Sequence, residues 1–290
     1  MTTASPSSRA LQPRELPFRK MHGIGNDFVV LDARNRALDL TTKAARTLAD
    51  RRWGVGCDEI LIIEKPRNGG DAFMGVRNAD GSVAEQCGNG VRCVADVLMT
   101  ETGKSKLVLE TLGGPVIATR AANGHVSIDM GPARLDWREI PLAEARDTLH
   151  LGITEGPLSD PVGVSMGNPH AVFFVPDVNA VDLKTFGPKL EHHALFPQRA
   201  NVEVVHVRSR THLRMRVWER GSGITQACGT GACASVVAAA RRGLSERAVT
   251  ITLDGGDLQI AWLDNGHVMM TGPVAYAFDG VWTLSEAEPP

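Results

Sequence analysis

The amino-acid sequence predicts an α+β fold made of two duplicated, pseudo-symmetric domains, each a strand-rich sheet wrapped around one central helix. Two observations predict it. Short β-branched runs, punctuated by Gly, Asn, Asp and Pro, far outnumber helical patterns. Two motifs also recur at nearly the same spacing, about half of the 290-residue length. Because equivalent turns of two such halves face each other, we expect the functional site in the cleft between them.

The internal repeat rests on two pairs of segments. The sequence GNDF at 25–28 is similar to GNPH at 167–170, which lies 142 residues later. The sequence CGNG at 87–90 is similar to CGTG at 228–231, at a spacing of 141 residues. If the glycine-rich turns were unrelated, the two pairs would not be expected to have nearly the same spacing. We therefore interpret the chain as one fold that occurs twice.

Three helices and ten strands are expected from the hydrophobic pattern. Segment 88–102 places apolar residues on one side and ends at Gly103, and segment 229–242 does the same before Gly243. A third helix is expected over 41–52. The expected strands are 28–31, 60–63, 106–109, 116–119, 126–130, 172–175, 202–207, 213–218, 249–253 and 258–262.

Composition excludes several classes of protein. With 31 basic and 33 acidic side chains, the chain has no basic field that would indicate nucleic-acid binding. Its longest apolar runs are far shorter than the ~20 residues of a membrane span. The Ser/Pro/Thr-rich start has no apolar core, which predicts a disordered tail over 1–17 rather than a signal peptide. Five cysteines without an export signal then indicate free thiols in the cytoplasm.

No metal or nucleotide cofactor is expected. Cys87 and Cys93 are six residues apart and Cys228 and Cys233 are five apart, so neither pair shares a helix face or has a structural-zinc spacing. We interpret Cys57, Cys93 and Cys233 as small core residues. Neither a complete phosphate-binding loop nor a three-glycine dinucleotide fingerprint is present in the sequence.

Cys87 and Cys228 differ from the other thiols because each directly precedes a Gly-X-Gly turn and a helical segment. Unpaired backbone N–H groups and the positive end of the helix dipole would face a ligand there. We expect them to lower the thiol pKa from ~8.5 toward neutrality and to hold a substrate carboxylate. Two facing thiols can remove a proton from one face of a carbon and return one to the other, a stereoinversion. A redox disulfide is the competing use, but no Cys-X-X-Cys motif is present.

These segments resemble the diaminopimelate epimerase family. The similarity lies in HGIGNDF at 22–28, NADGS at 78–82, QCGNGVRC at 86–93, GNPH at 167–170, NVE at 201–203, WERG at 218–221 and ACGTG at 227–231. The resemblance implies a cofactor-independent, two-base epimerase that converts LL-diaminopimelate to the meso form for lysine and peptidoglycan synthesis. It also implies that Cys87 and Cys228 are the acid/base pair.

The resemblance further implies the substrate-binding residues. Backbone N–H groups of Gly88, Asn89, Gly229 and Thr230 would hold the reacting carboxylate. Arginine, carboxylate and amide side chains together suit a dicarboxylate with two ammonium groups. The residues that would hold the rest of the substrate are Asn26, Asn78, Asn168, Asn201, Glu219 and Arg220.

Two further residues have an open role. His170 follows a Gly-Asn turn and is either a hydrogen-bonded structural residue or a catalytic one. Glu59 stands where some relatives carry a Gln that contacts substrate. It is therefore either turned away from the site or in contact with an ammonium group.

The family fold also implies the organisation of the chain. The N-terminal half would comprise 18–131 and the C-terminal half 132–272, with 273–290 returning to the first half. A homodimer is expected, with a small-molecule substrate and with neither nucleic acid nor membrane as partner.

Two alternatives remain open from the sequence. A proline racemase-type enzyme has the same architecture, but such relatives usually carry Cys-Gly-His-Gly, where this chain has Asn89, and lack a Glu219-Arg220 pair. A ligand-binding or thiol-redox protein could keep the fold without turnover. Binding alone, however, would not require a cysteine in each half.

Overall fold

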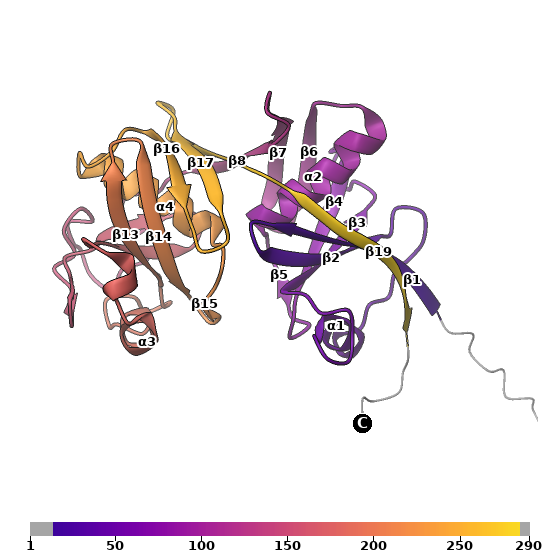
Figure 1. Cartoon of the computed structure of the whole chain (residues 1–290), viewed down its shortest axis with the longest axis horizontal. Helices are drawn as coiled ribbons and strands as arrows, with labels where there is room; N and C mark the ends of the chain where they lie inside the picture. Colours follow the sequence, from indigo (N-terminus) through magenta and orange to yellow (C-terminus); the bar gives the residue numbers. More distant parts are fainter. Residues whose placement is uncertain (1–13, 285–290) are drawn as a thin grey trace, which may run out of the picture.

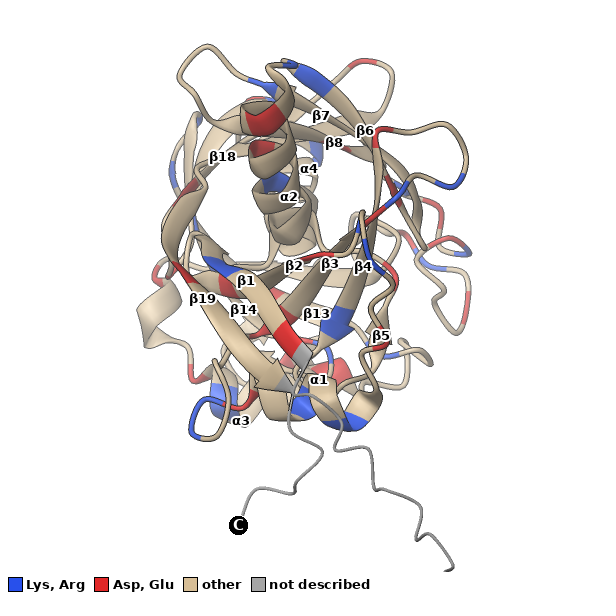
Figure 2. Cartoon of the chain, turned by 90° about the vertical axis from the view of Figure 1, so that its right-hand side faces the viewer, with Lys and Arg blue, Asp and Glu red and all other residues tan. Residues whose placement is uncertain are grey.

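Two halves lie side by side, each built around one helix (Figure 1). The computed structural model describes residues 14–284. Helix α2 (Gly88–Thr102) is central to the first half and helix α4 (Gly229–Arg241) to the second. Viewed from the side, both helices lie inside a ring of strands, one behind the other (Figure 2). This is the predicted α+β arrangement.

The first half takes most of its elements from the N-terminal part of the chain. They are β1 (Arg14–Gly23), β2 (Asn26–Asp32), α1 (Thr42–Ala49), β3 (Glu59–Glu64), β4 (Ala72–Asn78), β5 (Val83–Ala84), β6 (Lys106–Thr111), β7 (Gly114–Arg120) and β8 (Val126–Pro132). Strands β2 and β3 pair in parallel, β3 and β4 antiparallel, and β4 and β6 in parallel. Strands β6, β7 and β8 then form an antiparallel meander.

The second half repeats this order. Its elements are β9 (Thr154–Glu155), β10 (Leu158–Ser159), β11 (Val162–Ser165), β12 (Pro169–Phe174), the 3-10 helix η1 (Val178–Ala180), α3 (Leu183–Glu191), β13 (Asn201–Ser209), β14 (His212–Glu219), β15 (Gly223–Ile224), β16 (Ala248–Thr252), β17 (Asp257–Trp262) and β18 (His267–Gly272). Strands β12, β13, β14 and β16 pair in the same sequence of directions as β2, β3, β4 and β6. The duplication inferred from sequence spacing is therefore confirmed.

The chain crosses between the halves twice. It leaves the first half after β8, and it returns through β19 (Ala275–Leu284), the long yellow strand of Figure 1. Strand β19 pairs antiparallel with β1, and β8 pairs antiparallel with β18. Hydrogen bonds and side-chain packing from both ends of the chain thus stabilise the first half.

Strand β1 begins before the predicted end of the tail. Residues 14–17 belong to this strand, and the buried Leu16 packs with Phe18 and Val29. Their backbone partners lie in β19, more than 250 residues away in the sequence. Composition alone could not reveal such pairing. The remaining residues of the predicted tail, 1–13, lie outside the described part of the chain.

The expected helices agree closely with the structure. Helix α2 has the predicted bounds, α4 ends one residue early, and α1 is shorter than predicted. The sequence pattern does not predict α3, because Gly187 and Pro188 lie inside it. Its start is fixed by Asp182, whose side chain accepts two backbone N–H groups. None of the helices within 14–284 is long and apolar enough to cross a membrane.

Three cysteines lie in the core, as predicted. Cys93 on α2 and Cys233 on α4 are fully buried, and Cys57 is nearly so. Burial raises the pKa of each of these thiols to about 12. They are therefore protonated, unreactive core residues.

Replacing Gly103 by alanine tests the C-terminus of α2. Gly103 has a φ of 71° and donates its N–H to the Met99 carbonyl. A side chain there meets nothing within 4 Å, so the cost is backbone strain alone. We expect the free energy of unfolding to fall by about 1 kcal/mol in denaturant titrations. The control Gly103→Asn should lose less, because Asn tolerates the left-handed region; equal losses would contradict this explanation.

Candidate active site

Each half places one cysteine at the start of its central helix. Cys87 is the N-cap of α2 and Cys228 is the N-cap of α4, both with an extended backbone. The Cys87 sulfur accepts the Gly90 N–H at 3.3 Å, and the Cys228 sulfur accepts the Gly231 N–H at 3.3 Å. Both thiols therefore lie at the unpaired N–H groups of a helix N-terminus.

Gly231 is required for space and not for its backbone conformation. The φ angle is not positive at any of the glycines in the two Gly-X-Gly turns. A Cβ at position 231 would lie 2.7 Å from the Glu203 carboxylate and 3.1 Å from the Cys228 sulfur. Any side chain there would displace the thiol from its N–H donor.

The N-terminal ends of α2 and α4 meet between the halves. The Asn89 amide, in the first turn of α2, donates to the Ala227 carbonyl of the second half at 3.2 Å. It also donates to the Asn26 side-chain oxygen at 3.1 Å. The Cys87 thiol donates to that same oxygen at 3.9 Å. A ligand bound here would meet the first turns of both helices.

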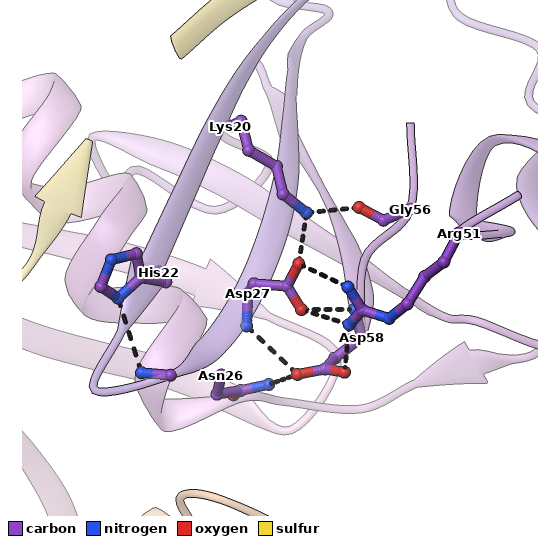
Figure 3. Close-up of polar contacts among 8 residues, drawn as sticks. Lys20, His22, Asn26, Asp27, Arg51, Gly56 and Asp58 are labelled. Carbon is purple, nitrogen blue, oxygen red and sulfur yellow. Dashed lines mark hydrogen bonds and ion pairs between the residues drawn. The ribbon is translucent and has the colours of Figure 1, made fainter. Parts of the chain in front are cut away.

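A charged network holds Asn26 in this orientation (Figure 3). The Asp58 carboxylate accepts the Asn26 amide at 3.0 Å and the Asp27 N–H at 3.2 Å. Arg51 bridges Asp58 and Asp27, at 2.9 Å and 2.6 Å, and Lys20 also contacts Asp27. Burial opposes ionisation of Asp27, but hydrogen bonds from Arg51 and Lys20 lower its pKa to about 2. Asp27 therefore stays ionised, and the network fixes the amide.

His170 is a buried, hydrogen-bonded residue in the second half. Its Nδ1 lies 2.7 Å from Glu203, and both side chains are fully buried. Its Nε2 lies 2.9 Å from the Asn168 oxygen, and the Asn168 amide donates to the Thr230 hydroxyl at 3.3 Å. That hydroxyl lies 3.6 Å from the Cys228 sulfur. His170 is therefore linked to Cys228 through Asn168 and Thr230.

The remaining amide and arginine candidates lie at strand ends. The Asn201 amide donates to the Pro169 carbonyl at 3.0 Å, and its oxygen accepts the Arg220 N–H at 2.9 Å. The exposed Arg220 guanidinium donates to the Gln198 carbonyl at 3.1 Å. In the first half, the Asn78 amide donates to the Ser82 hydroxyl at 2.9 Å. Asn201 thus fixes the backbone at Arg220.

Two carboxylates face the thiols. Glu219 lies beside Cys228, whose pKa its charge raises, and accepts the Thr225 hydroxyl. Glu59 lies beside Cys87, whose pKa its charge raises, so it is not turned away from the site. Burial raises the pKa of both carboxyl groups, that of Glu59 to about 7. Each half therefore places one carboxylate beside its own cysteine.

The expected lowering of the thiol pKa values is wrong for the protein by itself. Burial raises the pKa of Cys87 and Cys228 well above the ordinary value for cysteine. The neighbouring carboxylates raise them further, Glu59 at Cys87 and both Glu219 and Glu203 at Cys228. The helix N–H groups act in the opposite direction but contribute less. Desolvation, which the sequence does not reveal, outweighs the helix terminus.

Sequence reasoning missed the residues that contact the predicted site residues and fix their orientation. They include Asp58 and Arg51 in the first half, and Glu203 and Thr225 in the second. Glu203 carried a usable signal, because a charged residue interrupts the apolar run Val202–Val205, where every position is buried. Asp58 and Arg51 carried none, since their network depends on a loop meeting the start of β2.

The assembled groups suit an amino acid better than a metal ion. Within 14–284, no three His, Cys, Asp or Glu side chains are grouped as metal ligands would be. Helix N–H groups and amides bind a carboxylate, and carboxylates bind an ammonium group. Two thiols at converging helix ends can exchange protons with a carbon held between them.

Comparison with known proteins identifies the family. The family model for diaminopimelate epimerase matches residues 18–135 and 162–277. The chain belongs to this family. It is 59% identical over 264 residues to a diaminopimelate epimerase of Rhodospirillum centenum, covering 91% of each chain. It is 52% identical to one of Acidiphilium cryptum, covering 91% of this chain and 95% of that one. The resemblance noted from the motifs is confirmed, and the chain is an epimerase.

Solved structures of more distant proteins share the fold. A hydroxyproline epimerase from Agrobacterium vitis superposes with a TM-score of 0.69 at 14% identity, covering 95% of this chain and 93% of that one. A phenazine biosynthesis protein of the PhzF family from Bacillus anthracis gives 0.67 at 14% identity, covering 93% and 99%. The predicted fold class is thereby confirmed.

Replacing Asp58 by alanine tests the network behind Asn26. Without this carboxylate the Asn26 amide is free to rotate away from Cys87, so we expect kcat/KM to fall about tenfold, or ~1.4 kcal/mol. Steady-state kinetics and a melting curve measure the effect. The control is Asp50→Ala, because Asp50 accepts two backbone N–H groups elsewhere in the same loop. A comparable loss of activity in the control would contradict a specific role for Asp58.

Proposed function

We propose that the protein interconverts LL- and meso-diaminopimelate without a cofactor. The observation that carries this proposal is one thiol per half, each at the N-terminus of a central helix, at the point where the two helices meet. Relatives with 59% and 52% identity over nearly the whole chain are named diaminopimelate epimerases. A thiol on each side of one carbon is the minimum that inversion by proton transfer requires.

Cys87 and Cys228 act as the acid/base pair in this proposal. Starting from the LL isomer, the Cys87 thiolate removes the α-proton and the Cys228 thiol donates a proton to the opposite face. The reverse reaction exchanges the two roles. The α-hydrogen is a very weak acid, so the developing enediolate must be stabilised by hydrogen-bond donors. The first-turn N–H groups of Gly88, Asn89, Gly229 and Thr230 are positioned at the helix ends to provide them.

Glu219 binds an ammonium group of the substrate in this proposal. Its carboxylate, which raises the pKa of Cys228, would then be neutralised by the bound cation. An opposite charge beside a carboxylate–thiol pair favours the thiolate. Substrate binding would therefore lower the thiol pKa at the moment when a base is needed.

The distal carboxylate is held by amides and one guanidinium. Arg220 is exposed and offers a planar pair of N–H donors, which matches a carboxylate. His170 would hold Asn168 for the same purpose through its 2.9 Å contact. The amides assigned to the substrate are Asn26, Asn78, Asn168 and Asn201.

The reaction belongs to the synthesis of lysine and of peptidoglycan precursors. We place the enzyme in the cytoplasm, where a reducing environment would preserve its five free thiols. We propose 14–131 and 132–272 as the limits of the two halves, with 273–284 assigned to the first. The first half starts at 14 and not at 18, because residues 14–17 belong to β1.

Deuterium uptake from solvent tests the reaction and its catalytic pair. In heavy water without added cofactor, the wild-type protein should exchange the α-hydrogen of LL-diaminopimelate and leave proline unchanged. Cys87→Ala and Cys228→Ala should each lower epimerisation at least about a thousandfold, because each removes an acid/base group. Cys57→Ala removes a core thiol and should keep the activity.

Three results would contradict the proposal. Exchange with proline alone would favour the racemase alternative. Absence of exchange with either substrate would favour a binding protein. Near-normal inversion by either active-site cysteine variant would exclude the two-base mechanism.

We also propose that the protein forms a homodimer through strand β19. Tyr276, Phe278 and Val281 on this strand are 56%, 49% and 60% exposed, an unusual concentration of apolar surface. A groove of about 430 Å³ adjoins it. The groove is lined by Pro17, Phe18, Arg19, Val30, Asp32, Ile63, Asp279, Gly280 and Val281.

Light scattering tests the dimer. The wild-type mass should be twice the 31.1 kDa of one chain, and Phe278→Lys should reduce it to one chain by placing a charge in the contact. Leu244→Lys, at an exposed apolar position of the second half, should leave the mass unchanged. A wild-type protein of single-chain mass at micromolar concentration would exclude the dimer.

A further inference from the structure

Glu59 is a carboxylate whose charge no neighbouring group offsets. It is the first residue of β3 and lies beside Cys87, whose pKa its charge raises. Leu61, two residues further along the same face of β3, packs against Gly90 next to Cys87. Its Oε2 atom is buried and has no hydrogen-bond partner. The charged groups that face it are Asp58, from the same strand end, and Glu219, from the second half. Both are acidic, so an ionised Glu59 is unpaired in this part of the described chain. Cys87 in turn faces the buried Arg92 guanidinium and the Cys93 thiol. A buried oxygen without a partner requires an explanation.

The internal symmetry shows that Glu59 and Glu219 occupy exchanged positions. The β3–β4 register pairs Glu59 with Asn78. The β13–β14 register, continued by one residue, places Asn201 opposite Glu219. Strand β3 corresponds to β13, and β4 to β14. In the first half the carboxylate, Glu59, is the first residue of β3. In the second half the carboxylate, Glu219, is the last residue of β14. Each half nevertheless has one carboxylate and one amide at this edge.

A two-base reaction leaves the enzyme in a different protonation state after each turnover. After an LL-to-meso turnover, Cys87 carries the proton taken from the substrate, and Cys228 has lost one. Cys87 must release its proton before it can act as a base again. Glu59 is the carboxylate whose charge acts on the Cys87 thiol, which makes it the candidate acceptor.

We propose that Glu59 is a positioning residue that shares one proton with Cys87, accepting it when the cysteine must act as base. In this step the S–H bond breaks and leaves its electron pair on sulfur, while an O–H bond forms on the Glu59 carboxylate. The pair keeps a single negative charge, and no other reactant is needed. The assignment of this step to catalysis rests on the proposed epimerase mechanism.

The ionisation behaviour of Glu59 supports this role. Burial raises its pKa to about 7, although the neighbouring Cys87 thiol opposes the increase. An ordinary glutamate, with a pKa near 4.3, would hold almost no proton at neutral pH. Glu59 can therefore be protonated or ionised under working conditions, which a proton carrier requires.

Alkylation of Cys87 across the pH range tests the shared proton directly. Iodoacetamide labelling of the substrate-free protein is followed by mass spectrometry of the Cys87 peptide, in wild type and in Glu59→Gln. In wild type, the rate of Cys87 labelling should stop rising between about pH 7 and 9. Over this range the Glu59–Cys87 pair has lost one proton and shares the one that remains, so the thiolate fraction stays constant. In Glu59→Gln the levelling should disappear. Labelling should then rise about tenfold per pH unit and exceed wild type about tenfold at pH 8.

Matched variants separate this role from a structural one. Glu64→Gln changes the same residue type at the other, more exposed end of β3 and should keep the wild-type curve. Glu59→Asp retains the carboxyl group and should keep the levelling, which preserves the test if Glu59→Gln fails to fold. Superimposable curves for wild type and Glu59→Gln would overturn the proposal.

Kinetics distinguish the proposal from a simple ammonium contact. If Glu59 only binds an ammonium group of the substrate, Glu59→Gln should raise KM and leave the labelling curve unchanged. The proposal expects the labelling curve to change and the pH dependence of kcat in the LL-to-meso direction to change with it. Because labelling needs no substrate, it reports on the proton pair even if diaminopimelate is not the substrate.

Discussion

The meeting of two helix N-termini across an internal repeat is the constraint on which the rest of the structure depends. Each helix end leaves backbone N–H groups without partners, and one cysteine sulfur accepts one of them at each end. The remaining N–H groups need a ligand, which an anion supplies. The strands around α2 and α4 end near the same point, so their terminal side chains gather around this ligand position. Fold and site thus follow from one arrangement.

Two effects act in opposite directions on the thiol pKa values: the helix N–H groups lower them and desolvation raises them. In the protein by itself desolvation prevails, and the thiols and their carboxylate neighbours hold protons more tightly than they would in water. The Asn26 network behaves differently, because Arg51 and Lys20 keep Asp27 ionised. The charged residues therefore lie behind the Asn26 amide, which they hold in place. The carboxyl groups with raised pKa values, Glu59 and Glu219, lie beside the thiols. In the first half the two kinds are adjacent in sequence, since Asp58 belongs to the network behind Asn26 and Glu59 lies beside Cys87.

The sequence allowed prediction of features that depend on local order along the chain. Periodicity located α2 and α4, and the repeat spacing located Cys87 and Cys228 at their N-termini. Features that depend on distant contacts could not be predicted. The β1–β19 pairing joins the two ends of the chain, α3 contains a Gly-Pro pair, and the direction of the thiol pKa shifts depends on enclosure by both halves. Glu59 was visible as a candidate, but only its position beside Cys87 limits what it can do.

The return of β19 has a consequence for how the molecule can move. The second half is inserted into the first, because both ends of the chain complete the first half. Its two connections to the first half lie next to each other, since β8 pairs with β18 immediately before the chain returns through β19. A paired ribbon of this kind bends more easily than it stretches or slides. Any movement of one half relative to the other must therefore act on both connections together.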